Sequence, residues 1–243
     1  MHPINRSRSR GWLSPFRHGP ILRQRKIPRR VIAKSKVPRS DLFVTTKIKN
    51  ENQEWNDLIP SFEESLGNLQ TDYADLLLLH FPVTEFRRPA WRLMERLAKD
   101  GRAKSIGVSN YTIRHLEELL RECAIPPAVN QVELHIFLQQ PELVDYCRKH
   151  DIVVEAYSPL AHGERMNDPK LAAVAKKHGK TPAQVMIRWC LEIGTVPLPK
   201  SVRPERIKAN FDVFDFSLDN SDLAALRTLE SGLRTCWDPT HIA

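Results

Sequence analysis

The chain has 243 residues, of which 41% are hydrophobic and 27% charged, a composition typical of a globular protein with a sizeable core. No apolar run approaches the roughly 20 residues that a membrane helix needs, and nine glycines exclude a collagen-like or glycine-rich linker protein. The four cysteines, Cys123, Cys147, Cys190 and Cys236, are scattered along the chain. We therefore expect neither a disulfide framework nor a cysteine zinc site, and we expect a reducing, cytoplasmic environment.

The net charge of +8 comes entirely from the first part of the chain. Residues 1–40 hold 12 of the 37 Lys and Arg residues and no acid, which leaves 25 basic against 29 acidic side chains in residues 41–243. The body of the protein is therefore slightly acidic. A protein that binds nucleic acid through its body needs a basic face there, so this class of partner is not expected.

Residues 1–30 differ from the rest because they combine nine basic residues with four prolines, Pro3, Pro15, Pro20 and Pro28. An organelle transit peptide is rich in arginine and poor in acids, but it also needs an amphipathic helix, which these prolines disfavour. We expect a disordered basic head over residues 1–30 and one folded domain over residues 31–243.

Beyond the head, short apolar runs alternate with helical patterns. The predicted strands are residues 42–46, 75–80, 105–109, 129–133, 152–157 and 195–197. The predicted helices are residues 56–69, 112–122, 140–150, 169–178, 182–192 and 219–229. Continuous apolar strands between helices indicate an α/β fold with a parallel sheet. Thr181 and Pro182 form a good helix start, with the hydroxyl as N-cap and proline at the first helical position.

Polar residues lie at the carboxyl ends of several of the predicted strands, which is how a (β/α)₈ barrel builds its active site. They include Lys47, His80, Ser109, Glu133 and Tyr157. No G-x-G-x-x-G motif follows a strand, which argues against a Rossmann fold. A barrel needs eight strands, and the sequence provides six.

Six segments in the same order resemble the aldo-keto reductase family. They are DLFVTTKIKN, FEESLGNLQTDYADLLLLHFP, GRAKSIGVSNY, NQVELH, VVEAYSPLA and VPLPKSVRPERIKANFDVFDF. The resemblance begins near residue 31 and extends to about Cys236. It implies a (β/α)₈ TIM-type barrel, here without its first two βα units, and an ancestral NADPH-dependent reduction of an aldehyde or ketone.

The resemblance assigns two catalytic residues. Lys47 corresponds to the family's lysine, which lowers the pKa of a neighbouring tyrosine phenol, as a nearby ammonium does. His80 corresponds to the histidine that orients and polarises the substrate carbonyl. Without the family, Lys47 could be an exposed lysine at a strand end and His80 a core histidine.

The resemblance also assigns a binding site for NADP(H). Ser109, Asn110 and Gln131 resemble the residues that bind the nicotinamide carboxamide, and Tyr157 resembles the aromatic residue that stacks on the ring. Further cofactor contacts are implied for Ser158 and Leu160 (pyrophosphate), Lys200, Ser201, Val202 and Arg206 (adenosine 2′-phosphate), and Asn210 (adenine). Two cations and a hydroxyl near one phosphate favour NADP(H) over NAD(H).

The family's catalytic tyrosine and its aspartate lie before the lysine strand, where this sequence has neither. Its first tyrosine is Tyr73 and its first acid is Asp41. We therefore expect impaired reductase activity, because a general acid contributes about 10²–10⁴-fold to the rate. Two alternatives are a non-catalytic NADP(H)-binding pseudoenzyme or regulatory subunit, and a truncated isoform without a stable function.

His80, Glu133 and His135 could also be read as metal ligands, but no H-x-H pair ends an early strand, so no metal is expected. The expected partner is a small carbonyl substrate, with no nucleic acid and no membrane, and we expect a monomer.

Overall fold

The computed structural model describes Ile32 and residues 35–243, so the predicted basic head lies outside the described residues. These residues form two compact units. Unit 1 comprises the described residues up to Ser109, Arg114–Ala128 and Ile242–Ala243. Unit 2 comprises Asn110–Ile113 and Val129–His241. Each unit contains three parallel strands, which confirms the predicted α/β class.

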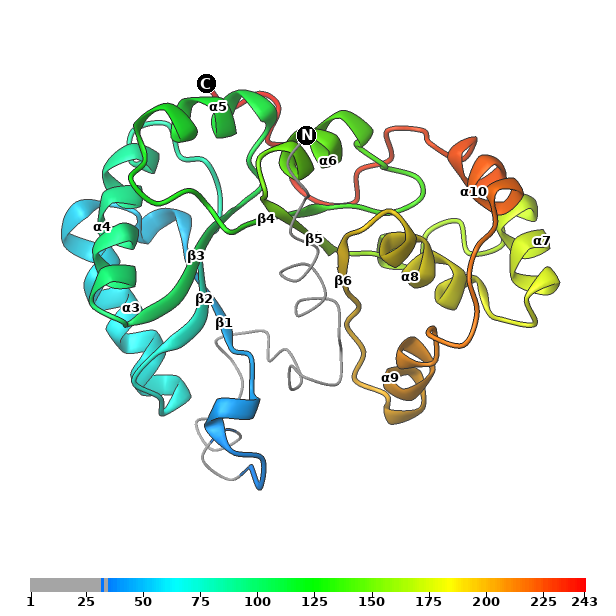
Figure 1. Ribbon diagram of the computed structural model, residues 1–243, viewed down its shortest axis with the longest axis horizontal. Helices are drawn as coiled ribbons and strands as arrows, with labels where there is room; N and C mark the ends of the chain where they lie inside the picture. Colours follow the sequence, from blue (N-terminus) through cyan, green and yellow to red (C-terminus); the bar gives the residue numbers. More distant parts are fainter. Residues whose placement is uncertain (1–31, 33–34) are drawn as a thin grey trace, which may run out of the picture. The chain divides into compact units, whose positions relative to one another are not determined.

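Unit 1 contains β1 (Thr45–Ile48), β2 (Ala74–Leu79) and β3 (Ala103–Ser109), in this order. Its helices are α3 (Trp55–Leu69), α4 (Arg87–Lys99) and most of α5 (Ile113–Glu122), with short 3₁₀ turns at Arg39–Asp41 and Asn50–Asn52. Helix α3 packs on β1, and α4 packs on β2 and β3 (Figure 1). All six residues of β2 are buried, as expected for a parallel strand covered on both faces.

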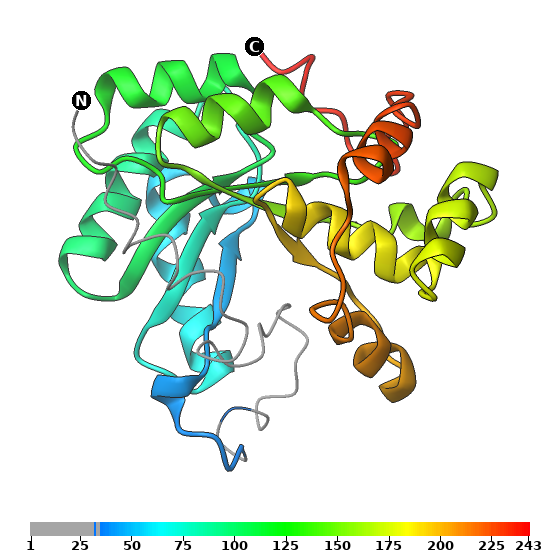
Figure 2. The same ribbon diagram turned by 45° about the vertical axis from the view of Figure 1, so that its right-hand side comes forward.

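Unit 2 contains β4 (Val129–Glu133), β5 (Val153–Tyr157) and β6 (Val196–Leu198), again in parallel. Its helices are α6 (Pro141–Lys149), α7 (Pro169–Lys177), α8 (Pro182–Glu192), α9 (Pro204–Phe211) and α10 (Asn220–Arg227), and a 3₁₀ turn spans Ala161–Gly163. Helix α6 packs on β5 and α8 on β6, while α8 also packs against α7 and α9 (Figure 2).

The predicted start of α8 is confirmed. Thr181 accepts a hydrogen bond from the backbone N–H of Gln184, whose side chain accepts one from the N–H of Thr181, and Pro182 is the first helical residue. Such a capping box satisfies two N–H groups that the helix itself cannot. The bounds of β4 and α8 are those expected from the sequence, and most other elements differ by one or two residues at an end.

The first strand was predicted wrongly over residues 42–46. It begins at Thr45 and ends at Ile48, so Lys47 lies within it instead of following it. The backbone N–H of Val44 donates to the Asp75 carboxylate over 3.0 Å, and the ladder with β2 starts one residue later. Helices α4 and α9 were not predicted, although Ala90, Trp91, Met94 and Leu97 give α4 a buried stripe at helical spacing.

Candidate active site

Lys47 and Ser109 meet at the carboxyl end of the strands of unit 1. The Lys47 ammonium donates to the Ser109 hydroxyl over 2.9 Å. Lys47 pairs with Leu78 in the ladder, and Leu79 pairs with Val108, so the ends of β1, β2 and β3 are in register. Parallel strands with aligned ends bring the residues that follow them to one edge.

His80 follows β2 at the same edge. Its Nδ1 lies 3.0 Å from the amide oxygen of Asn50, which belongs to the 3₁₀ turn after β1. An amide oxygen can only accept a hydrogen bond. In this arrangement Nδ1 therefore carries the ring proton and donates a hydrogen bond to the Asn50 side chain. The neutral ring then has no proton on Nε2, and His80 donates from Nε2 only when its ring is protonated.

Tyr73, the first tyrosine of the chain, lies at the other end of β2. It precedes the strand, five residues before the Leu78 that pairs with Lys47. At about 3.3 Å per residue, this separates Tyr73 from Lys47 by about 16 Å along the strand. Its ring is instead held between two cations, Arg39 at 3.9 Å and Lys104 at 4.0 Å from the ring centroid. Tyr73 therefore cannot deliver a proton beside Lys47.

Asn110, Gln131 and Tyr157 come together in unit 2. The Tyr157 hydroxyl donates to the Asn110 side-chain oxygen over 2.8 Å, and the Asn110 backbone N–H donates to the Gln131 carbonyl over 3.0 Å. The Gln131 amide also donates to Glu155 on β5 over 2.6 Å. Asn110 has a positive φ of 64°, a conformation that asparagine tolerates better than most residues.

The loop after β5 has a strained backbone. Ser158, Ala161, His162 and Arg165 have positive φ angles of 49°, 46°, 53° and 52°. Each costs about 1 kcal/mol or more for a residue with a side chain, and such strain is concentrated at functional sites. The predicted cofactor residues Ser158 and Leu160 lie in this loop and are partly exposed.

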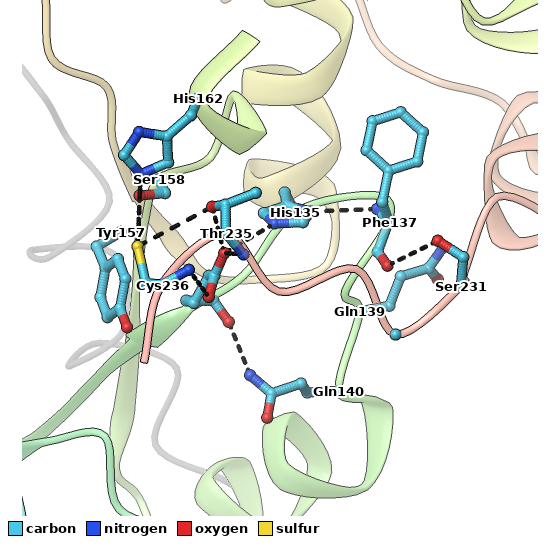
Figure 3. A network of polar contacts seen from close by, with 12 residues as sticks. His135, Phe137, Gln139, Gln140, Tyr157, Ser158, His162, Ser231, Thr235 and Cys236 are labelled. Atoms are coloured by element: carbon cyan, nitrogen blue, oxygen red, sulfur yellow. Dashed lines mark hydrogen bonds and ion pairs between the residues drawn. The ribbon is translucent and has the colours of Figure 1, made fainter. Parts of the chain in front are cut away.

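Glu133, at the end of β4, holds the C-terminal segment of unit 2 through Thr235 and Cys236, which are labelled in Figure 3. Its Oε1 accepts from the Thr235 N–H over 2.7 Å and from the Thr235 hydroxyl over 2.6 Å, while its Oε2 accepts from the Cys236 N–H over 3.2 Å. Burial alone raises the pKa of this carboxyl, but the hydrogen bonds from His135 and Thr235 outweigh burial and lower the pKa to about 2. Glu133 is therefore a buried, ionised carboxylate, and we call its hydrogen bonds to Thr235 and Cys236 the clasp.

Glu133 also pairs with His135, whose Nε2 lies 3.3 Å from Oε1. Among the described residues, no group of three or more His, Cys, Asp or Glu side chains is placed to hold a metal ion. Glu133 thus contacts His135 and the C-terminal segment, and in the described part of the chain these side chains form no metal-binding group with His80.

The remaining predicted cofactor residues lie just before α9 and within it. Lys200, Ser201 and Val202 precede the helix, whereas Arg206 and Asn210 lie within it. Lys200 and Arg206 are exposed, and within the described ranges neither side chain forms an ion pair. Two available cations beside a hydroxyl suit a dianionic phosphate.

Sequence reasoning missed three partners of these residues. Asn50 binds His80, Glu155 binds Gln131, and Thr235 binds Glu133. The aligned strand ends offered a signal for Asn50, which follows β1 as His80 follows β2. No local signal pointed to Thr235, which is 102 residues from Glu133.

Comparison with known proteins identifies relatives that match most of the chain. The model of the aldo/keto reductase family matches residues 24–231. A glyoxal reductase of Bacillus subtilis is 44% identical over 211 residues, which are 87% of this chain and 76% of the relative. An aldo-keto reductase of Mycolicibacterium smegmatis is 46% identical over 212 residues, 86% of this chain and 77% of the relative.

Solved structures agree with these sequence relatives. The aldo-keto reductase MGS-M4 from a deep-sea metagenome library superimposes with a TM-score of 0.85 at 41% identity, over 88% of this chain and 80% of that one. AKR2E5 complexed with NADPH, the aldo-keto reductase of the silkworm Bombyx mori, has a TM-score of 0.79 at 36% identity over 83% of this chain and 68% of that one. These likenesses confirm the predicted fold class.

Among the described residues, no helix combines the length and the apolar character needed to cross a membrane.

Proposed function

Because this chain belongs to the aldo-keto reductase family, a family that uses NADP(H), we propose that its 243 residues bind NADP(H) and reduce a small aldehyde or ketone slowly. The observation that carries the proposal is the 2.9 Å hydrogen bond between Lys47 and Ser109. It joins the residue that corresponds to the family's catalytic lysine to one of the residues that correspond to its nicotinamide-binding group. The cofactor, when bound, supplies the hydride.

The donor set of unit 2 fits NADP(H). Asn110 and Gln131 carry the amide groups that a carboxamide needs, since an amide can both donate and accept. Lys200 and Arg206 supply positive charge for a phosphate, and Ser201 supplies a hydroxyl. Tyr157 supplies an aromatic face for a planar ring.

The proposed slow rate follows from the groups of this chain that can donate a proton to the reduced carbonyl. Reduction of a carbonyl leaves an alkoxide, which needs a proton as its charge develops. Lys47 has no tyrosine before it in the chain, and Tyr73 lies about 16 Å further along β2. Among the residues that the structure describes, His80 then remains as the proposed donor toward the carbonyl. With Nδ1 donating to Asn50, it acts only as an imidazolium.

The substrate class is a small, reactive carbonyl compound. The B. subtilis relative is named for glyoxal, and a relative from Salmonella typhi, 45% identical over 207 residues, is named as a putative methylglyoxal reductase. A small α-oxoaldehyde has a strongly electrophilic carbonyl carbon, so its reduction depends less on a general acid than that of an ordinary ketone.

The test is NADPH oxidation with methylglyoxal between pH 5.5 and 8, corrected for acid decay of NADPH. We expect turnover below the ordinary enzyme range of about 1–10³ s⁻¹, rising as the pH falls, and lost in His80→Ala. Turnover within that range would contradict the proposed impairment. If the unaltered protein binds NADPH but, like His80→Ala, shows no turnover at any pH, the pseudoenzyme alternative is established instead.

Cofactor binding is tested separately by NADPH fluorescence. We expect NADPH to bind more tightly than NADH, and Arg206→Ala to remove most of the difference. Glu205→Ala, next to it on α9, is the matched control and should keep the preference. Equal affinities of the unaltered protein for the two cofactors would overturn the phosphate assignment.

A further inference from the structure

A thiol, an imidazole and a hydroxyl meet in unit 2 beside the clasp formed by Glu133. The His162 Nε2 lies 3.4 Å from the Cys236 sulfur and 3.1 Å from the Ser158 hydroxyl, and that hydroxyl lies 3.7 Å from the sulfur (Figure 3). His162 is exposed, and Cys236 and Ser158 are partly exposed, so a small reagent from solvent can reach the group. A thiol next to an imidazole is the arrangement that creates a nucleophilic thiolate.

The other three cysteines lack this arrangement. Burial raises the pKa of Cys147 to about 11 and that of Cys190 to about 12. Cys123 is partly exposed, but burial and the nearby Glu95 carboxylate raise its pKa as well. A raised pKa keeps a thiol protonated and inert. The chain thus contains its own unreactive references for Cys236.

Two independent features hold Cys236 against His162. On one side, Glu133 accepts hydrogen bonds from the backbone N–H groups of Thr235 and Cys236. On the other, the strained turn at Ala161–Gly163 places His162 at a φ of 53°. Pre-organised geometry of this kind is what a reactive pair requires.

The charged groups around the thiol leave the imidazole as its proton acceptor. Both carboxylate oxygens of Glu133 already accept hydrogen bonds, one of them from the Cys236 N–H. Arg234 and Asp238, the charged residues nearest to Cys236 along the chain, pair with each other over 3.3 Å. Ser158 shares Nε2 with the thiol, but sulfur is the stronger nucleophile toward a soft electrophile.

We propose that Cys236 and His162 form a nucleophilic site that takes soft carbon electrophiles, in particular α,β-unsaturated carbonyl compounds. In the reaction, His162 accepts the thiol proton and the sulfur forms a bond to the β-carbon. The electron pair of the C=C bond moves toward the carbonyl oxygen, giving an enolate. The imidazolium returns the proton to the α-carbon, so the addition needs no oxidant, reductant or cofactor. The addition uses neither Lys47 nor His80, although Ser158 is also one of the predicted cofactor residues.

The test is S-alkylation by N-ethylmaleimide, followed by trypsin digestion and mass spectrometry. Trypsin cleaves after Arg121, Arg148 and Arg234, so Cys236 lies in a different peptide from Cys123 and both rates are measured in the same sample. Cys147 shares the peptide of residues 122–148 with Cys123, and fragmentation of that peptide assigns the label to one of the two. A thiol without help, with a pKa of about 8.5, loses reactivity roughly 50-fold between pH 8.5 and pH 6.5, as its thiolate fraction falls.

We expect Cys236 to react at least about tenfold faster than Cys123 at pH 6.5 and to lose less than about tenfold between the two pH values. His162→Gln should slow Cys236 about tenfold or more at pH 6.5 and only slightly at pH 8.5. His150→Gln, an exposed histidine of the same unit, is the matched control and should change neither rate. Ser158→Ala should leave Cys236 faster than Cys123.

The proposal is overturned if Cys236 reacts no faster than Cys123 at pH 6.5, or if His162→Gln leaves its rate within about twofold. Labelling of Cys147 and Cys190, which are buried, reports loss of structure in any variant. If Cys147 and Cys190 become labelled in His162→Gln, the His162→Asn variant is used instead, and the same criteria apply.

Discussion

The Glu133 carboxylate offers a direct measure of how a buried charge stabilises this fold. Its pKa falls from an ordinary value of 4.5 to about 2 in the folded chain. A difference of about 2.5 pKa units corresponds to about 3 kcal/mol of folding free energy, at about 1.4 kcal/mol per unit. Because the folded pKa is the lower one, this stability is fully present above pH 4.5 and is lost as the pH falls through about 2.

Glu133→Gln removes the charge and keeps the size of the side chain. One amide oxygen can still accept from Thr235, but the amide NH₂ then faces the Cys236 N–H, a donor against a donor. We expect a loss of about 2–4 kcal/mol in the free energy of unfolding at pH 7, since hydrogen bonds to a buried charge are lost and a donor is left unpaired. At pH 2.5 the difference between variant and unaltered protein should shrink by more than half.

Urea unfolding at pH 7 and pH 2.5, followed by circular dichroism, measures both quantities. Glu164→Gln, which changes an exposed glutamate of the same unit, is the matched control and should stay within about 0.5 kcal/mol of the unaltered protein at both pH values. If Glu133→Gln loses less than about 1 kcal/mol at pH 7, or if its loss is the same at pH 2.5, the clasp does not stabilise the fold as an ionised carboxylate.

Three further changes test other parts of the chain. Thr181→Ala removes the N-cap of α8 and should cost about 1 kcal/mol in thermal unfolding; no change would show that the capping box is redundant. Asp222→Asn weakens the bonds from Lys177 (2.8 Å) and His178 (2.7 Å) to a buried carboxylate. It should lower the free energy of unfolding in urea by about 2 kcal/mol, whereas Asp145→Asn, at an exposed aspartate, should lower it by less than about 0.5 kcal/mol. Asn50→Ala releases Nδ1 of His80, so any NADPH oxidation should rise less steeply as the pH falls; an unchanged slope would show that Asn50 does not set the proton position.

The sequence predicted best where a residue's role depends on its neighbours in the chain. The α8 helix begins as Thr181 and Pro182 together predict, and β4, which overlaps the family motif NQVELH, also has the expected bounds. The first strand was misplaced because Leu42, Phe43 and Val44 look like a strand, whereas Asp75 takes the Val44 N–H and the polar Thr45 begins the ladder. That contact spans 31 residues and leaves no local trace.

The same difference between local signals and distant contacts holds for the candidate site. Lys47, His80 and Ser109 were found because family motifs surround them, and the structure joins Lys47 to Ser109. Their partners were not found, because a hydrogen bond such as that between His80 and Asn50 joins separate elements across 30 residues. A side chain's partner is set by tertiary packing, whereas its position at a strand end is set by local pattern.

The clasp between Glu133 and Thr235 also bears on how the protein folds during its synthesis. The two residues are 102 positions apart, so a ribosome that has just released β4 must add about a hundred residues before the donors for Glu133 exist. Until then the carboxylate either remains in water or is buried without its partners, which is costly. The end of β4 and the loop to α6 should therefore stay open, and accessible to chaperones or proteases, until synthesis of the segment around Thr235 is complete.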